Sequence, residues 1–363
     1  MQSKVAHSDI VQLDIPQMKL LITRAAGYVG SALMDALVQV AWIERLVCID
    51  LKPQPETTTA SAKIEWIQAD LSEEGWQSKV RPTQIDAVVH LAFQIRQLYG
   101  KSITTQERWN IGGARKVFEF ALNEPCVQRL IHFSTVTSYG AKPNNTLMRR
   151  FTENSALGED SYLYGVHKKQ VESVLRQLYA ASDKSKHVIV LRCASITGPL
   201  GRFKHRRYGL VSTLTRGLPI FPCGRSDFGR QYLHEDDITN IVSMLLMTQS
   251  KSGLEIFNAA PNDYLTIVDL AKLLALRAVV VPPFFLRLLF WLVWHASRGK
   301  IATAPGAWKT LSYPVAVDPS RLAREYGYKC RYSSVDALTG RRGRHALAYA
   351  EAKELAEVAV QSP

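Results

Sequence analysis

The chain has 363 residues, of which 47% are hydrophobic and 21% charged, and a formal net charge of +13. This length allows a large domain with a second lobe, and no repeat or low-complexity tract is visible. The five cysteines form no Cys-x-x-Cys pair, which argues against a disulfide framework or a metal site and fits a reducing compartment. The basic balance suggests anionic partners, but no nucleic-acid-binding module is visible, so we expect no nucleic-acid partner.

Residues 18–31 carry the first informative pattern. The apolar run 20–22 predicts a buried strand, and a turn of small residues separates it from a helical pattern at 32–37. In this arrangement the pyrophosphate of a dinucleotide rests on backbone N–H groups at the helix N-terminus. The expected spacing is Gly-x-x-Gly-x-x-Gly, and Gly27 and Gly30 hold its second and third places.

The first place of this spacing holds Arg24 instead of glycine. A side chain there could strain the turn or crowd the pyrophosphate. Alternatively, the turn keeps an ordinary φ and the guanidinium points at phosphate oxygens. We expect cofactor binding to be retained, because the remaining dinucleotide-site residues are present.

Strand-like runs alternate with helical patterns through the first half of the chain. Runs of this kind occupy 46–49, 64–68, 87–91, 130–133 and 188–191. The alternation predicts an α/β fold, a Rossmann-type doubly wound parallel sheet. We expect a dinucleotide-binding domain at 17–200, a smaller C-terminal substrate-binding lobe at 201–340 that is interleaved with the sheet, and a peripheral helix or tail at 341–363.

The stretch 278–295 is strongly apolar, but Pro282, Pro283 and Arg287 argue against a membrane-spanning helix. Three interpretations remain: a buried helix of the smaller lobe, a lid or mouth for an apolar substrate, or a helix lying in a membrane interface. The third allows membrane-surface contact through 278–300. The first sixteen residues show no apolar segment typical of a signal peptide, so we expect a cytoplasmic protein.

Acidic residues end two of the predicted strands. Asp50 follows Gly30 by twenty residues and ends the second strand. A carboxylate there accepts both ribose hydroxyls of the adenosine and repels a 2′-phosphate, which favours NAD over NADP. Asp70 and Leu71 end the third strand, where they could meet the adenine.

Tyr164 and Lys168 lie four residues apart and so share one face of a predicted helix. An ammonium beside a phenol lowers the pKa of the phenol and makes it usable as an acid and base near neutral pH. Ser134 and Thr135 follow a predicted strand, at the edge where α/β sheets bind ligands. A hydroxyl there can hold a substrate oxygen next to the tyrosine.

These segments, taken in order, resemble an extended short-chain dehydrogenase/reductase of the NAD-dependent epimerase/dehydratase family over about residues 19–338. The matching stretches are TRAAGYVGS (23–31), CID (48–50), ADL (69–71), VVHLAF (88–93), Asn110, HFSTVTSYG (132–140), YGVHK (164–168), LRCASITGP (191–199), RQYLHEDD (230–237), IFNAAPNDYLTIVDLAKLLA (256–275) and VDPSRLAREYGY (317–328).

The resemblance implies a set of residue roles. Tyr164 would be the acid/base, Thr135 the catalytic hydroxyl and Lys168 the residue that positions the nicotinamide ribose, with Asn110 near the active site. Arg230 would bind substrate phosphates. The cofactor site would include Arg24, Gly27, Tyr28, Val29, Gly30, Asp50, Asp70, Leu71, Leu91, Ala92, Phe93, Tyr164 and Lys168.

Three functions stay open at this point. The first is an NAD-dependent epimerase, dehydratase or related oxidoreductase acting on a nucleotide sugar, which Arg230 and the basic run 202–207 favour. The second is a dehydrogenase or reductase of an apolar, sterol- or lipid-like hydroxyl or ketone, favoured by 278–295 and by Ser195, where nucleotide-sugar epimerases usually carry Asn. The third is a cofactor-binding protein without turnover. We expect a homodimer, and no metal at His234, whose position suggests a helix cap.

Overall fold

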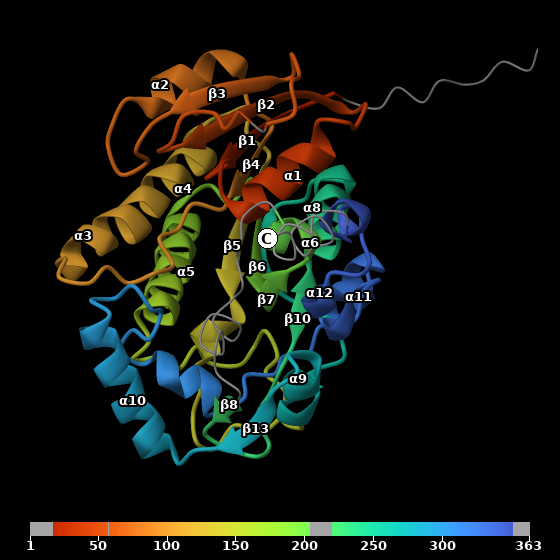
Figure 1. The fold of residues 1–363 in the computed structure, drawn as a ribbon. Coiled ribbons are helices and arrows are strands. Elements are labelled where there is room, and N and C mark those ends of the chain that lie inside the picture. Colours follow the sequence, from red (N-terminus) through yellow and green to blue (C-terminus); the bar gives the residue numbers. More distant parts are fainter. Residues whose placement is uncertain (1–16, 57, 204–219, 351–363) are drawn as a thin grey trace, which may run out of the picture.

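A computed structural model describes residues 17–56, 58–203 and 220–350 of the chain. Its centre is a seven-stranded parallel sheet in the order β11-β6-β5-β4-β1-β2-β3 (Figure 1). This order is that of a dinucleotide-binding fold, so the predicted Rossmann-type sheet is confirmed. The strands are β1 Met18–Thr23, β2 Ile43–Asp50, β3 Ile64–Gln68, β4 Ala87–His90, β5 Arg129–Thr135, β6 His187–Cys193 and β11 Gly253–Ala259.

Helices cover both faces of the sheet, which is why its central strands are apolar along their whole length. Figure 1 shows α1 and α8 on one face and α4 and α5 on the other. The first face has α1 Tyr28–Leu37, α8 Glu235–Met247 and α11 Ser320–Tyr326. The second has α2 Trp76–Val80, α4 Gly113–Asn123 and α5 Leu163–Ala181, with α3 Ile103–Glu107 and the π-helical turn η2 Arg108–Gly112 leading into α4.

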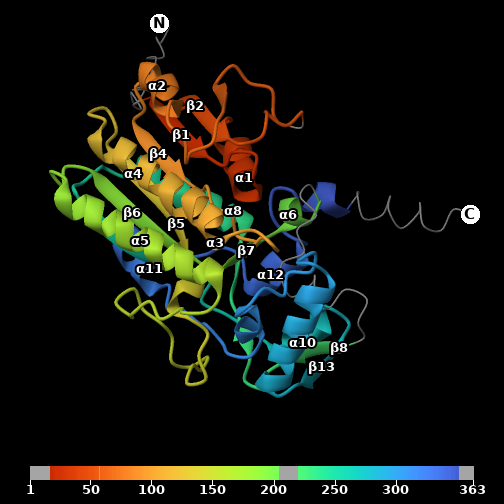
Figure 2. The ribbon, with the colours of Figure 1, turned by 90° about the vertical axis from the view of Figure 1, so that its left-hand side faces the viewer.

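A smaller lobe lies beyond the carboxyl edge of the sheet and has its own apolar core. It is built from short strand pairs and helices, and Figure 2 shows it below the sheet. The pairs are β7 Ser195–Thr197 with β10 Tyr232–His234, β8 Ile220–Cys223 with β13 Arg277–Val280, and β9 Gly229–Arg230 with β12 Leu265–Thr266. Four helices and a 3₁₀ turn follow in this part of the chain: α6 Pro199–Phe203, α9 Ile267–Leu273, α10 Pro283–Ala296, η4 Ala307–Leu311 and α12 Ser334–Thr339. Two further 3₁₀ turns lie earlier in the chain, η1 Arg81–Thr83 after α2 and η3 Val136–Tyr139 after β5.

His234 caps α8, as its position in the sequence suggests. Its Nδ1 accepts a hydrogen bond from the backbone N–H of Asp236 at 3.0 Å, and its Nε2 lies 3.0 Å from the carbonyl oxygen of Arg342. Both ring nitrogens are therefore used in holding α8 and the segment that follows α12. Within the described residues, no group of three or more His, Cys, Asp or Glu side chains could hold a metal ion.

The apolar stretch 278–295 forms the end of β13 and most of α10, and only one side of α10 is buried. Leu286, Phe290 and Trp294 enter the core of the smaller lobe. The opposite side is exposed, with 71% of Phe284 and 57% of Trp291 open to solvent. The interpretation of this stretch as a buried helix is therefore wrong for most of its length. No helix among the described residues is long and apolar enough to cross a membrane.

Beyond α12 the chain turns back over the start of α8. The backbone N–H of Arg344 donates to Asp236 at 2.7 Å, and the Arg344 guanidinium lies 3.2 Å from the same carboxylate. Most of the helix expected in the C-terminal tail falls at 351–363, outside the described residues.

Candidate active site

Two adjoining cavities open at the carboxyl edge of the sheet, and Arg24, Gly27 and Phe93 line both. The first, which we call the cofactor groove, has a volume of about 440 Å³. The second, the reaction pocket, has a volume of about 360 Å³. Every site residue expected from the sequence lines one or both. The cofactor groove holds Asp50, Asp70, Leu71, Ala92 and Asn110, and the reaction pocket holds Tyr28, Val29, Gly30, Leu91, Thr135, Tyr164, Lys168, Ser195 and Arg230.

The turn between β1 and α1 is tight enough to require glycine at Gly30. A Cβ at that position would lie 2.8 Å from both the Cα and the carbonyl oxygen of Ala25. These neighbours are backbone atoms, which cannot swing aside. The start of α1 is thereby held close to the end of β1, and residues 27–30 at this start line the reaction pocket.

Arg24 has a φ of +55°, in the left-handed region that favours glycine. The alternative in which the turn keeps an ordinary φ is therefore wrong. The Arg24 side chain passes over Gly27, since a Cβ on Gly27 would lie 3.1 Å from Cγ and 3.2 Å from Nε of Arg24. The guanidinium arm thus crosses the N-terminus of α1, where the sequence pattern places a pyrophosphate.

Asp50 is held in place at the end of β2 by two backbone donors. Its Oδ2 accepts from the N–H of Ala26 and its Oδ1 from the N–H of Lys52, both at 3.0 Å. The first bond ties the carboxylate to the glycine turn. Asp70 accepts hydrogen bonds from the backbone N–H of Ser72 at 2.8 Å and from the Ser72 hydroxyl at 2.7 Å. These bonds stabilise the turn after β3.

Thr23 is a buried residue that the sequence argument did not select. Its Oγ1 accepts from the N–H of Leu91 at 3.0 Å and from the N–H of Ala92 at 3.1 Å. The hydroxyl therefore ties the end of β1 to the segment after β4, which forms the wall between the two cavities. The available signal was a polar residue ending an otherwise apolar strand.

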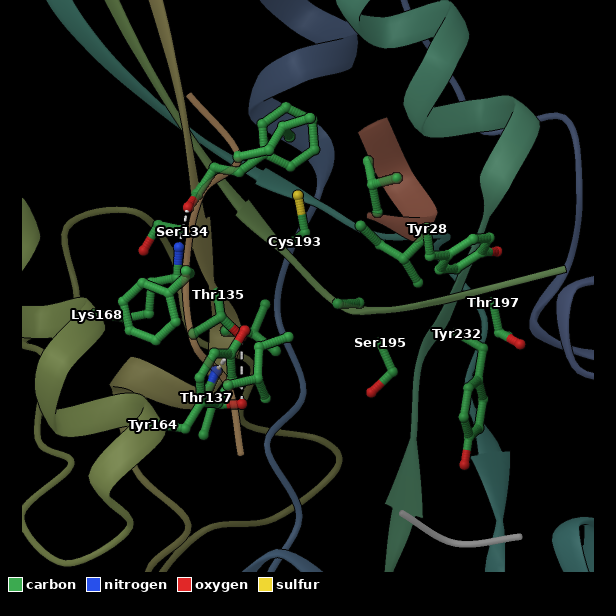
Figure 3. Close-up of a pocket in the computed structure, with 18 of the residues that line it drawn as sticks. Tyr28, Ser134, Thr135, Thr137, Tyr164, Lys168, Cys193, Ser195, Thr197 and Tyr232 are labelled. Atoms are coloured by element: carbon green, nitrogen blue, oxygen red, sulfur yellow. Dashed lines mark hydrogen bonds between the residues drawn. The ribbon is translucent and has the colours of Figure 1, made fainter. Parts of the chain in front are cut away.

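Thr135 and Tyr164 lie together on one wall of the reaction pocket, contributed by β5 and α5 (Figure 3). A hydrogen bond from Thr135 lowers the pKa of Tyr164, but burial is the larger effect and raises this pKa above its usual value. The expectation of a lowered pKa at Tyr164 is therefore wrong. The Tyr164 ring packs edge-on against Phe93, with the ring centroids 5.6 Å apart.

Lys168 is buried and its ammonium is already bonded. Its Nζ donates to the carbonyl oxygen of Phe133 at 2.5 Å and lies 4.1 Å from the centroid of the Phe93 ring. Burial lowers the pKa of Lys168 to about 7. Phe93 thus contacts both Tyr164 and Lys168.

Behind this wall lies a buried ion pair that the sequence analysis also missed. Arg192 on β6 donates from Nη2 to Glu172 on α5 at 2.8 Å, and both side chains are 1% exposed. Ser134 donates to the same carboxylate at 2.5 Å. The pair fixes α5 against β5 and β6, and so fixes the direction from which Tyr164 and Lys168 approach the pocket.

Asn110 is buried beside the cofactor groove and is occupied with the loop after β4. Its Oδ1 accepts from the N–H of Gln94 at 2.6 Å, and its Nδ2 donates to the carbonyl oxygen of Gln94 at 3.0 Å. This pair of bonds makes Asn110 a positioning residue for the loop that carries Phe93.

The opposite wall of the reaction pocket comes from the smaller lobe. In Figure 3, Ser195, Thr197 and Tyr232 face Thr135 and Tyr164 across the opening. Ser195 is exposed, as a ligand-contacting residue requires. Arg230 enters the same pocket, and its Nη2 donates to the carbonyl oxygen of Thr310 at 2.9 Å. In the basic run 202–207, residues 204–207 lie outside the described residues.

No residue of 278–295 is among the described residues that line the reaction pocket. The smaller lobe instead contributes Leu274 and Thr310, which lie before and after this stretch. The interpretation of 278–295 as a lid or mouth for an apolar substrate has no support in these contacts.

Comparison with known proteins gives this geometry a family. A model of the "NAD dependent epimerase/dehydratase family" matches residues 20–260. The chain belongs to this family. The match runs from β1 to β11 and so includes the edge of the sheet at which both cavities open. It confirms the expected enzyme class.

Among curated proteins, an uncharacterised protein of Mycobacterium bovis is 26% identical over 330 residues, which cover 88% of this chain and 82% of that protein. The dTDP-glucose 4,6-dehydratase of Salmonella typhimurium is 25% identical over 343 residues, covering 86% of this chain and 88% of that enzyme. Among solved structures, the enzyme WbmG of Bordetella bronchiseptica in complex with NAD and UDP has a TM-score of 0.66 at 23% identity, covering 92% and 94% of the two chains. This last likeness establishes the shared fold.

Proposed function

We propose that this protein is an NAD-dependent enzyme that acts on a nucleotide sugar by hydride transfer, with Tyr164 as acid and base. The observation that carries the proposal is that Thr135, Tyr164, Lys168 and Arg230 line one pocket, and that this pocket adjoins the groove of Asp50. Proton-transfer groups and a phosphate-binding cation therefore reach one bound molecule.

The residues of the cofactor groove fit a dinucleotide. Gly30 allows the close approach of β1 and α1, and the N-terminus of α1 supplies N–H groups for two phosphates. Asp50 is the ribose partner, and its negative charge opposes the extra phosphate of NADP. Arg24 supplies a cation at the same turn. When bound, NAD supplies the carbon that accepts or returns a hydride.

The protein's own residues move the proton. Thr135 holds the substrate hydroxyl beside Tyr164, and the phenolic oxygen takes the hydroxyl proton as the carbon–hydrogen bond is broken. Because burial raises the pKa of Tyr164, ionisation of the phenol needs a nearby positive charge. Lys168, one helical turn further along α5, would supply that charge in its ammonium form and would also hold the ribose of NAD.

The nucleotide part of the substrate belongs on the side of the smaller lobe. Arg230 uses Nη2 to bond to Thr310, its guanidinium carries further N–H groups, and guanidinium groups suit a diphosphate. Two relatives point to the same class: one curated relative is a dTDP-glucose dehydratase, and WbmG was solved with UDP.

The test of the chemical step is Tyr164→Phe. Without the phenolic oxygen, turnover of UDP- or dTDP-hexoses is expected to fall by about 10³-fold, while NAD affinity measured by calorimetry stays within about twofold of the wild type. Tyr162→Phe is the matched control, since Tyr162 lines the same pocket and has no assigned proton-transfer role. Equal turnover in Tyr164→Phe and wild type would refute the assignment, and NAD binding without any turnover in wild type would favour a non-catalytic protein.

The test of the substrate class is thermal stabilisation by UDP and dTDP. We expect a rise in melting temperature that Arg230→Ala abolishes and Arg225→Ala preserves, because Arg225 pairs with Asp227 outside the pocket. Mass spectrometry of molecules that copurify with the protein would identify the nucleotide. Stabilisation by apolar alcohols in place of nucleotides would overturn the nucleotide-sugar proposal.

A further inference from the structure

The outer side of α10 is the largest run of exposed apolar side chains on any described helix. We call it the apolar face, and it consists of six side chains that are all 45% or more exposed: Phe284, Phe285, Leu288, Leu289, Trp291 and Leu292. The helix rotates 100° per residue, so these positions cover the side opposite to Leu286, Phe290 and Trp294. An exposed apolar patch of this kind marks an interaction surface.

The chain around the apolar face is basic and carries no acid. From 270 to 317 the sequence has no Asp or Glu, but it has six Lys or Arg residues. Three of these, which we call the basic rim, are exposed on α10 or within four residues of its end: Arg287, Arg298 and Lys300. The turn η4 packs against α10, and its Lys309 is paired with the carboxylate of Asp160 at 3.1 Å. The face is thus apolar in its centre and positive at its margin.

The same composition extends to the neighbouring loop at 95–103. Tyr99 packs against Trp294 and His295, with ring centroids 5.6 Å and 5.7 Å apart, and Arg96 donates to the carbonyl oxygen of Lys300. The loop therefore packs against the end of α10 and places the basic residues Arg96 and Lys101 nearby in the chain.

We propose that the apolar face of α10 and its basic rim bind the surface of an anionic lipid membrane. Phe, Leu and Trp enter the boundary between headgroups and acyl chains, and Lys and Arg contact the negative headgroups, each adding about 1 kcal/mol. A helix of 14 residues is about 21 Å long, too short to cross the hydrocarbon core, so α10 lies along the surface.

The charges favour a membrane over a second copy of the chain. In a twofold dimer through this face, the basic rim of one protomer would meet the basic rim of the other, and the stretch 270–317 offers no carboxylate to pair with it. An anionic membrane supplies the missing negative charge. In Figures 1 and 2, α10 lies at the end of the molecule remote from β2, β3 and α2, so the sheet would point away from the lipid.

The test is flotation of the full-length protein with vesicles. Wild type is expected to float with phosphatidylcholine vesicles that contain phosphatidylglycerol, and binding should drop with pure phosphatidylcholine or at high salt. The double variant Phe284→Gln/Leu288→Gln should weaken binding by about tenfold or more. Arg287→Gln/Arg298→Gln should weaken it and reduce its dependence on salt.

Met148→Gln is the matched control, because Met148 is 84% exposed on a loop outside this surface and should leave binding unchanged. NAD-induced stabilisation of each variant checks folding independently of lipid. Absence of flotation with anionic vesicles, or equal flotation of the α10 variant and wild type, would overturn the proposal. So would a dimer in light scattering that Phe284→Gln/Leu288→Gln converts to monomer without any vesicle binding by the wild type.

Discussion

At the residue scale, Arg24 is the feature in which this chain departs most from its family's pattern. The turn keeps the left-handed backbone that glycine normally supplies, although arginine occupies the position. A residue with a Cβ costs about 1 kcal/mol or more in this conformation. The strained backbone occurs at the residue whose guanidinium reaches the N-terminus of α1, which is consistent with a role of Arg24 in binding phosphate.

Two substitutions separate the backbone of Arg24 from its side chain. Arg24→Ala removes the guanidinium and keeps the strained φ, whereas Arg24→Gly removes both. We expect Arg24→Gly to be about 1 kcal/mol more stable than Arg24→Ala in urea unfolding. Both should bind NAD more weakly than wild type by calorimetry, because the pyrophosphate loses a cation. Tighter NAD binding by either variant would show that the side chain obstructs the site.

The sequence predicted which residues line the site, but it did not predict their pKa values. Tyr164 and Lys168 were found because four residues make about one helical turn, a local relation. Their pKa values depend mainly on burial, which is produced by segments distant in the sequence, so the raised pKa of Tyr164 was not predictable from spacing. The role of Asn110 was similarly hidden, because its partner Gln94 is set by the fold of a loop.

At the element scale, patterns of hydrophobicity predicted six of the seven sheet strands and their parallel arrangement, because a strand covered on both faces must be apolar throughout. They did not predict β11, which forms one edge of the sheet. They were less informative for α10. A run of apolar residues does not say which side is covered, and only the tertiary arrangement leaves six of them exposed. The close contact of β1 with α1 is a relation between elements that the glycine spacing did predict.

Substituting Gly30 tests that contact. Gly30→Ala places a Cβ against the backbone of Ala25, so we expect a loss of about 3 kcal/mol in stability and loss of NAD binding. Gly112→Ala is the control, since a Cβ there meets nothing within 4 Å and should raise stability slightly, by up to about 1 kcal/mol. Chemical denaturation measures both. A Gly30→Ala protein as stable as wild type would mean that β1 and α1 can separate without cost.

At the scale of the whole molecule, the sheet and the smaller lobe meet through buried polar groups as well as apolar ones. Glu235 begins α8 and is 1% exposed. Its carboxylate accepts from the backbone N–H groups of Leu200 at 2.7 Å and Gly201 at 3.1 Å, and from the hydroxyl of Tyr28. It therefore joins α1, α6 and α8 beside the reaction pocket. The sequence suggested a cap at this helix start but not these partners, because they come from two distant segments.

Glu235→Gln tests how far this junction holds the molecule together. The amide keeps the size of the carboxylate but turns an N–H₂ group toward donors, so we expect a loss of about 2–3 kcal/mol in urea unfolding. Tyr28→Phe removes one donor and leaves the carboxylate two partners, which should cost about 1 kcal/mol. The double variant should lose less than the sum, since the two side chains share one hydrogen bond. The control is Glu119→Gln, which removes an exposed ion pair with Arg115 on the same helix. It should change the free energy of unfolding by less than about 0.5 kcal/mol. If Glu235→Gln behaved like Glu119→Gln, the junction of α1, α6 and α8 would contribute no more to stability than an exposed ion pair.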